Sequence, residues 1–369
     1  MSPDPTPPPA PDDSLIISGS VSGPFVTPPN LAAGPPPKNR FEPVDSQERI
    51  ADLVAQLRET VDKLARDASS RGDLKILSRT LRELRYAFKV FAPYRGRRKV
   101  TVFGSARTSK TEPAYIQGQL LGQVMAEQKW LVVTGAGNGI MEAEHVGAGR
   151  ESSMGINIML PFEQSANEVI RGDEKLVHMK YFFTRKLMFV KECDAVCCLP
   201  GGFGTIDEAL EVLTLLQTGK RDMVPVVLLD EPGGSFWKDF VDFIRRRQLE
   251  AKLISPEDVS LFFLTDDARA AVDEIVGFFS NYHSMRYVRN KLVFRLQRAP
   301  TEAELATIND QFSSILVEGK FELSHEPLEE ERDEVELAKM TRLVFRFNRR
   351  NFGRLRQLID HLNKLPVAG

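Results

Sequence analysis

Hydrophobic residues follow two alternating patterns through the middle of the chain, from about residue 96 to residue 283. Short apolar runs typical of buried strands alternate with longer segments whose apolar positions recur at helical spacing. This alternation predicts a Rossmann-like, doubly wound parallel sheet of the α/β class. The expected strands are residues 100–103, 130–134, 154–158, 195–199, 223–229 and 259–263, with a further one within 176–183. The expected helices include residues 115–127, 184–190 and 236–246.

Residues 44–95 carry helical patterns only. Apolar positions form one stripe between Ile50 and Leu64 and a second between Leu77 and Phe91. The segment 45–48 has the form of a capping box, Asp73 can cap the second helix, and Pro93 ends it. We therefore expect a helical hairpin, packed on the main domain or on a second subunit.

Residues 284–369 contain a weak internal repeat. Residues 292–295 and 343–346 each form an apolar run that a helical pattern follows, at 301–312 and 351–363. Two such units predict a small C-terminal α/β appendage. It could dimerise the protein, bind an effector, or serve only as a packing extension.

Composition and charge exclude several classes of protein. A hydrophobic fraction of 42% is enough for a packed core, and a net charge of −2 gives no basic field for nucleic acid. Residues 1–43 hold thirteen of the 23 prolines, which predicts a disordered Pro-rich tail.

Cysteine and histidine usage favours a reducing compartment and no metal. The 3 cysteines and 5 histidines show no zinc-ligand spacing, and adjacent Cys197 and Cys198 would point to opposite faces of a strand. We find no signal-peptide pattern and no apolar run long enough to span a bilayer. The expectation is a cytoplasmic protein without a membrane partner.

The most informative stretch is residues 200–208, Pro-Gly-Gly-Phe-Gly-Thr-Ile-Asp-Glu, which joins a predicted strand to a predicted helix. Open α/β sheets bind ligands at this edge, where glycines allow close approach and a helix N-terminus favours a phosphate. Thr205 can add a hydroxyl to such a cradle. Glu208 lies one turn further on the same helical face, where it can act on the atom beside the phosphate.

Two other phosphate-binding patterns fit poorly. A dinucleotide fingerprint needs a glycine at position 140, but the third glycine is Gly139 and Ile140 follows it. The next strand ends without an acid that could hold a ribose. No Walker motif occurs in the sequence, so NAD and phosphate-transfer ATPase chemistry are both disfavoured.

The remaining parts suit cleavage of a nucleotide's N-glycosidic bond. They are a pocket for one phosphate, glycine walls that admit a flat base, and two charged groups, Arg185 and Glu208. The transition state of this reaction resembles an oxocarbenium ion, so a carboxylate stabilises it and can activate water. A cation can hold the phosphate or assist the departing base.

These motifs resemble the Lonely guy (LOG) family of nucleoside 5′-monophosphate phosphoribohydrolases, some of which release cytokinins and many of which were once labelled lysine decarboxylases. The resemblance rests on residues 135–141 (Gly-Ala-Gly-Asn-Gly-Ile-Met), 184–186 (Thr-Arg-Lys) and 200–208. Ala136 stands where many members have glycine, and Asp207 where glutamate is common. The sequence outside the core looks more like the longer nucleotide nucleosidases and favours AMP or a related purine monophosphate as substrate.

The resemblance implies a role for each matching residue. Arg185 and Glu208 would be catalytic. The substrate-binding residues would be Gly104, Ser105, Gly137, Asn138, Met179, Lys186, Gly201, Gly202, Phe203, Gly204 and Thr205, with residues 202–205 on the phosphate and Met179 and Lys186 at the rim. The resemblance further implies no cofactor, no metal, and a homodimer or a larger homo-oligomer.

Two alternatives remain beside this interpretation, a non-catalytic carrier and a dimeric scaffold. A pyridoxal decarboxylase is not supported, since no lysine has the context of a Schiff base. A non-catalytic carrier of a nucleotide or pterin cofactor would explain the glycine turns, but it has no use for both Arg185 and Glu208. A dimeric scaffold explains the additional segments but not the turns.

Overall fold

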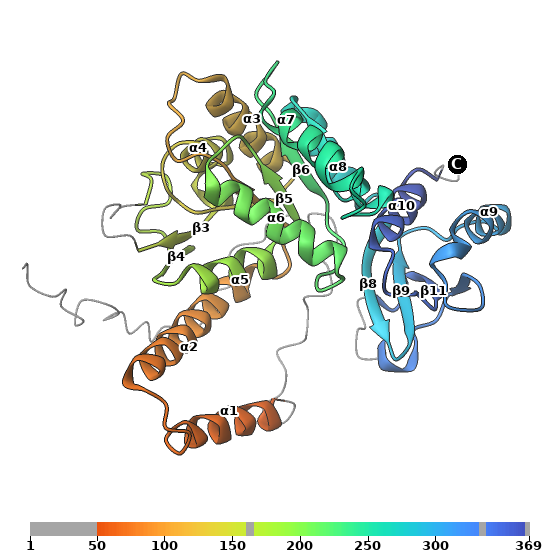
Figure 1. Ribbon diagram of the computed structural model, residues 1–369, viewed down its shortest axis with the longest axis horizontal. Helices are drawn as coiled ribbons and strands as arrows, with labels where there is room; N and C mark the ends of the chain where they lie inside the picture. Colours follow the sequence, from red (N-terminus) through yellow and green to blue (C-terminus); the bar gives the residue numbers. More distant parts are fainter. Residues whose placement is uncertain (1–49, 160–165, 332–336, 366–369) are drawn as a thin grey trace, which may run out of the picture. The chain divides into compact units, whose positions relative to one another are not determined.

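The computed structural model describes residues 50–159, 166–331 and 337–365. All of them belong to one compact unit, residues 34–369 (Figure 1). The predicted tail at 1–43 and the predicted capping box at 45–48 lie outside the described residues.

A seven-stranded parallel sheet forms the centre of this unit. Its strands are β1 (Lys99–Phe103), β2 (Leu131–Thr134), β3 (Ser153–Ile158), β4 (Leu176–Met179), β5 (Ala195–Cys198), β6 (Val226–Leu229) and β7 (Phe263–Thr265), in the order β4-β3-β2-β1-β5-β6-β7. Every residue of β1, β2, β3, β5 and β6 is buried, which explains why these strands contain mostly apolar residues without a regular alternation of apolar and polar positions. The predicted Rossmann-like, doubly wound fold is confirmed.

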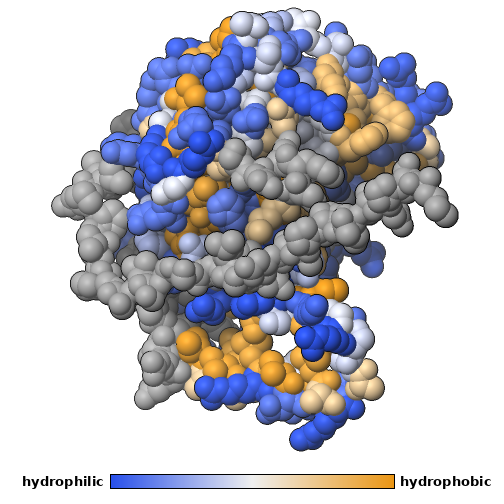
Figure 2. Space-filling view, turned by 90° about the vertical axis from the view of Figure 1, so that its left-hand side faces the viewer, coloured by the Kyte–Doolittle hydropathy of each residue, from blue (hydrophilic) through white to orange (hydrophobic). Residues whose placement is uncertain are grey.

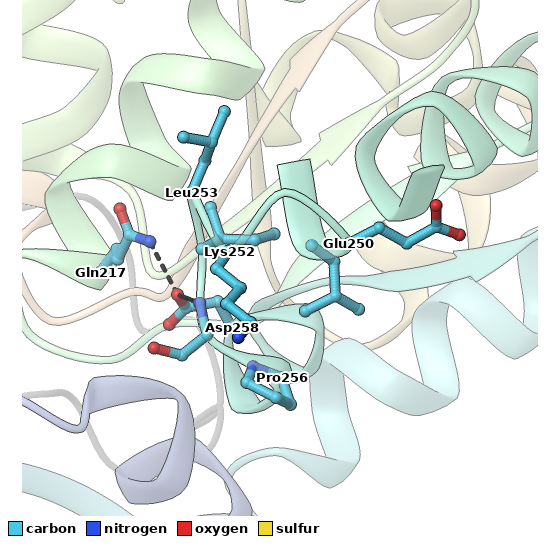
Figure 3. A pocket seen from close by; sticks show the side chains of 9 residues that line it. Gln217, Glu250, Lys252, Leu253, Pro256 and Asp258 are labelled. Atoms are coloured by element: carbon cyan, nitrogen blue, oxygen red, sulfur yellow. Dashed lines mark hydrogen bonds between the residues drawn. The ribbon is translucent and has the colours of Figure 1, made fainter. Parts of the chain in front are cut away.

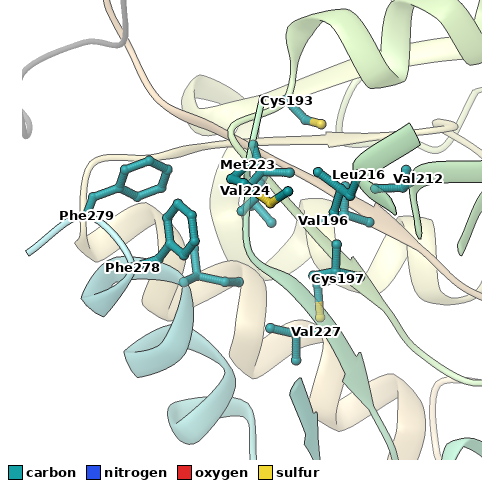
Figure 4. Packing of buried hydrophobic residues seen from close by; sticks show 14 of the residues in the cluster. Cys193, Val196, Cys197, Val212, Leu216, Met223, Val224, Val227, Phe278 and Phe279 are labelled. Atoms are coloured by element: carbon teal, nitrogen blue, oxygen red, sulfur yellow. The ribbon is translucent and has the colours of Figure 1, made fainter. Parts of the chain in front are cut away.

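Helices pack on this sheet and on one another. They are α3 (Pro113–Glu127), α4 (Ile140–Ser152), α5 (Phe182–Glu192), α6 (Phe203–Gln217), α7 (Phe236–Phe243) and α8 (Ala268–Gly277). Helix α3 contacts α4 and α8, whereas α5 lies against β3 and the N-terminal helix α2 (Arg71–Phe91). Figure 4 shows part of the resulting core, in which Val196 of β5 lies near Val212 and Leu216 of α6. Cys193, Cys197 and Cys198 are buried free thiols.

The strand order contains one switch point, at β1. The chain runs outward from β1 to β4 on one side and returns through β5 to β7 on the other. The turns after β1 and β5 therefore leave neighbouring strands in opposite directions, and the turn after β2 lies on the other side of β1. Ligands of open α/β sheets bind at such a point.

Two helices precede the sheet, α1 (Ala51–Leu64) and α2. No residue of α1 is buried, and its apolar side chains gather in the lower part of Figure 2. Helix α2 is anchored by buried Ala87 and Phe91, and a 3-10 turn at Ala92–Tyr94 follows it. The N-cap of α2 is Ser70, not Asp73: the Ser70 hydroxyl accepts from Asp73 N and the Asp73 carboxylate accepts from Ser70 N, a reciprocal capping box.

The C-terminal appendage is a four-stranded antiparallel sheet with two helices. Its strands are β8 (Tyr282–Val288), β9 (Lys291–Leu296), β10 (Glu322–Ser324) and β11 (Thr341–Phe345), in the order β10-β11-β9-β8, and its helices are α9 (Glu302–Phe312) and α10 (Phe352–Asn363). The two predicted repeat strands, β9 and β11, are neighbours, and both repeat helices form. The sequence analysis missed β8 and β10.

Two predicted strands end or begin elsewhere. The segment 176–183 stops pairing at Met179, because Phe182 and Phe183 already belong to α5. Residues Pro256–Leu261 form a 3-10 turn instead of starting a strand, since Ser255 and Asp258 cap it reciprocally, and β7 begins only at Phe263. Short 3-10 turns also occur at Ser313–Ile315 and Glu329–Glu331, and a π-helical turn at Ile244–Leu249 extends α7.

Candidate active site

Three glycine-containing turns meet at the carboxyl edge of the central sheet. The N–H of Ser105, after β1, donates to the carbonyl of Pro200, after β5, at 3.1 Å. The Ser105 carbonyl in turn accepts from the N–H of Ile140, at the start of α4, at 2.9 Å. The first turn is therefore hydrogen-bonded to both others, and it brings the predicted residues Gly104, Ser105 and Gly201 together.

Some of these glycines are needed because neighbouring segments come too close for a side chain. A Cβ on Gly201 would lie 2.2 Å from Thr205 Oγ1, and one on Gly104 would lie 2.6 Å from the Ile140 side chain. Gly139 has a φ of 64°, and its Cβ would lie 2.3 Å from the Ser105 carbonyl. These three glycines let the turns pack against one another.

Gly202 and Gly204 differ, because a Cβ on either would meet nothing within 4 Å. Gly202 is the N-cap residue of α6, and Phe203 between the two glycines is 94% exposed. The first turn of α6 thus faces open space with its backbone N–H groups and the positive end of its helix dipole. This is the geometry that binds a phosphate at a helix N-terminus. Thr205 is buried beneath this turn, beside Gly201.

Glu208 lies one helical turn deeper on α6 and is only 8% exposed. Burial raises the pKa of its carboxyl from 4.5 to about 7, against the opposing effects of Lys186 and Arg185. Among the described residues its Oε2 atom accepts no hydrogen bond. A buried carboxylate with an unused oxygen and a pKa near neutrality can exchange a proton with a bound molecule.

Lys186 links α5 to α6. Its Nζ lies 2.8 Å from Asp207, 2.7 Å from Glu211 and 3.9 Å from Glu208. Burial opposes the charge of this lysine, but its hydrogen bonds to Asp207 and Glu211 raise its pKa overall. Lys186 therefore stays charged beside Glu208.

Arg185 extends from α5 toward the turn after β2. Its Nε donates to the Ile156 carbonyl at 2.9 Å, and its guanidinium lies 5.0 Å from the centre of the Phe189 ring. A Cβ on Gly135 would come within 2.1 Å of an Arg185 nitrogen, so this glycine makes room for the guanidinium. The charge of Arg185 lowers the pKa of Glu208. The two residues of the predicted catalytic pair therefore lie close enough to interact electrostatically.

The turn after β2 joins this strand to α4. Gly137 and Asn138 lie in it; Gly137 is half-buried and Asn138 is exposed. Ala136 has a φ of 58°, a left-handed conformation that explains why many members of the family named above have glycine there. The Thr134 hydroxyl accepts from Ala136 N at 2.9 Å and holds this turn in place.

Met179 is the predicted site residue that the structure places apart from the turns. It ends β4, which two strands, β3 and β2, separate from β1 in the sheet, and its side chain is fully buried in the hydrophobic core. In the structure it packs within the protein and does not line an open surface.

Two polar residues near the site escaped the sequence analysis. Asn167 donates from Nδ2 to the Gly137 carbonyl at 3.0 Å and also contacts buried His145, whose pKa burial lowers to about 4. Glu83 of α2 accepts hydrogen bonds at the start of α5. Neither residue belongs to a local motif, so only the folded chain shows what they contact.

The described part of the chain contains neither a candidate metal-ligand group nor a candidate membrane-spanning helix. Residues 50–159, 166–331 and 337–365 contain no group of three or more histidine, cysteine, aspartate or glutamate side chains that could hold a metal ion. Within the same residues no helix is long and apolar enough to cross a membrane.

Figure 3 shows a surface hollow lined by Leu253, Pro256 and their neighbours, where Gln217 Nε2 donates to Asp258 at 2.8 Å. Gln217 ends α6, nine residues after Glu208 and so about 14 Å along the helix. The hollow is therefore separate from the glycine turns.

Comparisons with known proteins agree with the motifs. Residues 138–275 match the family model described as possible lysine decarboxylase. The cytokinin riboside 5′-monophosphate phosphoribohydrolase LOG3 of Arabidopsis thaliana is 27% identical over 212 residues, which are 56% of this chain and 94% of that protein. A probable cytokinin riboside 5′-monophosphate phosphoribohydrolase of Oryza sativa subsp. japonica, LOGL5, is 31% identical over 164 residues, or 43% of this chain and 63% of that protein.

Among solved structures, a molybdenum cofactor binding protein from Rippkaea orientalis aligns with a TM-score of 0.36 at 18% identity. The alignment covers 50% of this chain and 98% of that protein. The family-model match and the curated relatives confirm the resemblance that the glycine motifs predict: the central α/β domain of this chain is similar to phosphoribohydrolases of the Lonely guy family.

Proposed function

We propose that this protein hydrolyses the N-glycosidic bond of nucleoside 5′-monophosphates and releases the free base and ribose 5-phosphate. The observation that carries the proposal is the buried carboxyl of Glu208, whose pKa is raised to about 7 beside the open first turn of α6. The names of the curated relatives, which are phosphoribohydrolases, support it.

The phosphate would bind at the first turn of α6. Gly202 and Gly204 leave space for its oxygens, and backbone N–H groups with the helix dipole favour its charge. The base would then lie toward the turn after β2, with Gly137 and Asn138 along one side and Ser105 beneath. This orientation holds the sugar's C1′ atom between Arg185 and Glu208.

The chemistry follows from those two side chains. As the bond between C1′ and the base nitrogen breaks, its electron pair leaves with the base, and positive charge develops on the sugar. The Glu208 carboxylate stabilises that charge and takes a proton from the water whose oxygen bonds to C1′. Arg185 stabilises the negative charge on the phosphate or on the departing base.

The substrate class is part of the proposal. We favour AMP and related purine monophosphates over cytokinin precursors, because the additional segments on either side of the central domain resemble the longer nucleotide nucleosidases. We also propose a homodimer or larger homo-oligomer. The apolar side chains that α5 exposes, Phe182, Phe183 and Leu187 at 56%, 52% and 47%, support an interface next to the site.

The test measures free base and ribose 5-phosphate after incubation with AMP, GMP, IMP, CMP and a cytokinin riboside monophosphate. We expect the wild type to release base and Glu208→Gln to lose about 10²–10⁴-fold in kcat while still binding nucleotide. Arg185→Gln should lose activity similarly. Glu211→Gln is the matched control, since it removes an acid from the same helix that also pairs with Lys186, and it should stay within a few-fold of the wild type.

Two outcomes contradict the proposal. Tight nucleotide binding without release of base from any substrate would favour the alternative, a non-catalytic carrier of a nucleotide or pterin cofactor. Equal losses of kcat in Glu208→Gln and Glu211→Gln would contradict the proposed catalytic role of Glu208.

A further inference from the structure

Glu83 is a buried acid of helix α2, in the segment that precedes the matched family domain. It is 5% exposed. Its Oε1 accepts from the backbone N–H of Lys180 and from Arg79 Nε, both at 2.8 Å, and its Oε2 accepts from Thr184 Oγ1 at 2.8 Å. Each carboxylate oxygen therefore has a donor, and two of the three donors belong to a different part of the chain.

Those two donors lie on either side of the point where α5 begins. Lys180 precedes the helix, and Thr184 lies in its first turn. The N-cap residue of α5, Tyr181, makes no side-chain capping hydrogen bond. A negative charge near a helix N-terminus is favourable, and here α2 provides it in place of a local cap.

The catalytic candidates follow directly after this contact. Arg185 is the next residue after Thr184, and its Nε donates to the Ile156 carbonyl at 2.9 Å. Lys186 comes next and makes its ion pairs with α6. A displacement of the first turn of α5 would therefore move both cations, and errors of about 1 Å in an active site can reduce the rate about 100-fold.

Helix α2 does not depend on Glu83 alone for its place. Ala87 and Phe91 of α2 are buried in the core, and Lys191 of α5 lies 5.1 Å from the centre of the Phe88 ring. Loss of the carboxylate would therefore loosen the first turn of α5 and leave α2 attached. A change at Glu83 can therefore test its effect on the position of α5 without detaching α2 from the domain.

We propose that Glu83 is a positioning residue of the active site: it fixes the first turn of α5 and thereby the place of Arg185. The proposal rests on the hydrolase function proposed above. The proposal implies that α2, which lies outside the matched residues 138–275, contributes to the geometry of the active site.

The test uses the full chain with Glu83→Gln, Glu83→Ala and Thr184→Val. Gln keeps an acceptor oxygen at the same reach, so we expect kcat to fall about 10-fold in Glu83→Gln and about 100-fold in Glu83→Ala. KM should change less than about 3-fold, because the phosphate cradle on α6 is intact. The Glu83→Ala and Thr184→Val losses should not add in the double variant, since the hydrogen bond that Thr184→Val removes is already absent in Glu83→Ala.

Hydrogen exchange gives a readout that needs no activity. Amides of residues 180–188 should exchange faster in Glu83→Gln, while those of α6 should not. Arg82→Gln, a change of the exposed neighbour on α2, is the matched control and should alter neither kcat nor exchange.

These experiments distinguish failure of the Glu83 proposal from failure of the proposed hydrolase function. If the wild type releases no base, the function fails and the exchange of α5 still decides whether Glu83 holds the helix. Unchanged exchange overturns the proposal. Faster exchange with unchanged kcat, or strictly additive losses, also overturns it.

Discussion

Glu208 is the residue at which stability and the proposed chemistry oppose each other. Its burial beside the first turns of α6 suits a group that exchanges protons near neutral pH. The same burial penalises the ionised carboxylate in the folded protein. The consequence for stability has a definite sign.

Replacement of Glu208 by Gln should stabilise the protein at high pH only. The carboxyl has a pKa of about 7 in the folded chain against 4.5 in the unfolded one. Between these values the native state binds more protons than the unfolded state, so its free energy of unfolding decreases as pH rises from about 4.5 to 7. Glu208→Gln removes this penalty and should gain roughly 1–3 kcal/mol at pH 8 and nothing below pH 4.5.

Urea unfolding of both proteins at pH 4.5 and pH 8 measures the difference. Glu211→Gln is the control, because the side chain of Glu211 is 33% exposed and should show no such pH-dependent gain. The same gain for Glu208→Gln at both pH values would contradict the raised pKa.

At the scale of single residues, the sequence predicted those features that depend on the local spacing of residue types. Glycines at fixed positions between an apolar run and a helical pattern marked the turn 200–208, and the structure places it at the switch point. The strain at Ala136 and the hydrogen bonds of Glu83 were not predictable. Both depend on partners that are distant in the sequence, such as Asn167 for the Ala136 carbonyl.

Helices α3 and α4 of the central domain contact each other directly, and glycines make that contact possible. A Cβ on Gly122 of α3 would lie 2.3 Å from the Glu144 carbonyl, and one on Gly147 of α4 would lie 1.9 Å from the Gln119 carbonyl. Because both obstacles are backbone atoms, a side chain at either position must move a whole helix.

Gly147→Ala should therefore destabilise the protein by about 2–4 kcal/mol, in spite of the better helix propensity of alanine. The matched control is Gly277→Ala at the end of α8, where a Cβ meets nothing within 4 Å and a change of less than about 1 kcal/mol is expected. Chemical denaturation of the two variants measures both values. Equal stability of the two variants would contradict the close packing of α3 on α4.

Elements with strong periodicity were predicted well and short or mixed ones were not. The buried strands of the central sheet contain mostly apolar residues, whereas β8 contains Tyr282-His283-Ser284-Met285-Arg286 and β10 has three residues. Their pairing with β9 and β11 depends on contacts that no local pattern encodes. Val259 and Leu261 look like part of a strand, but the Ser255 cap holds them in a 3-10 turn.

Across the whole described chain, α10 connects the appendage to the central domain. It packs against the 3-10 turn Pro256–Leu261, against β8 and against α6. Asn363 Oδ1 accepts from the N–H groups of Asn281 and Tyr282 at 3.0 and 2.8 Å. The Cβ of an alanine at Gly353 would lie 2.3 Å from the Glu257 carbonyl. Contacts of this kind make independent unfolding of the appendage unfavourable.

Arg356 of α10 provides the sharpest test of this coupling. Its guanidinium pairs with Glu274 of α8 and, at 2.9 Å, with Asp360, and the arginine is buried. Arg356→Met keeps the length of the side chain but leaves both acids without this partner, which should cost about 2–3 kcal/mol because the acids are partly exposed.

Calorimetry should show one unfolding transition for the wild type and one, at lower temperature, for Arg356→Met, since the appendage and the central domain share a core through α10. Arg350→Met, at an exposed position before the helix, should leave the transition within about 1 °C of the wild type. Two transitions, of which only the first moves in Arg356→Met, would mean that the appendage unfolds on its own. One shared transition means that a molecule bound by the appendage would stabilise the central domain as well, because binding to the native state shifts the whole unfolding equilibrium.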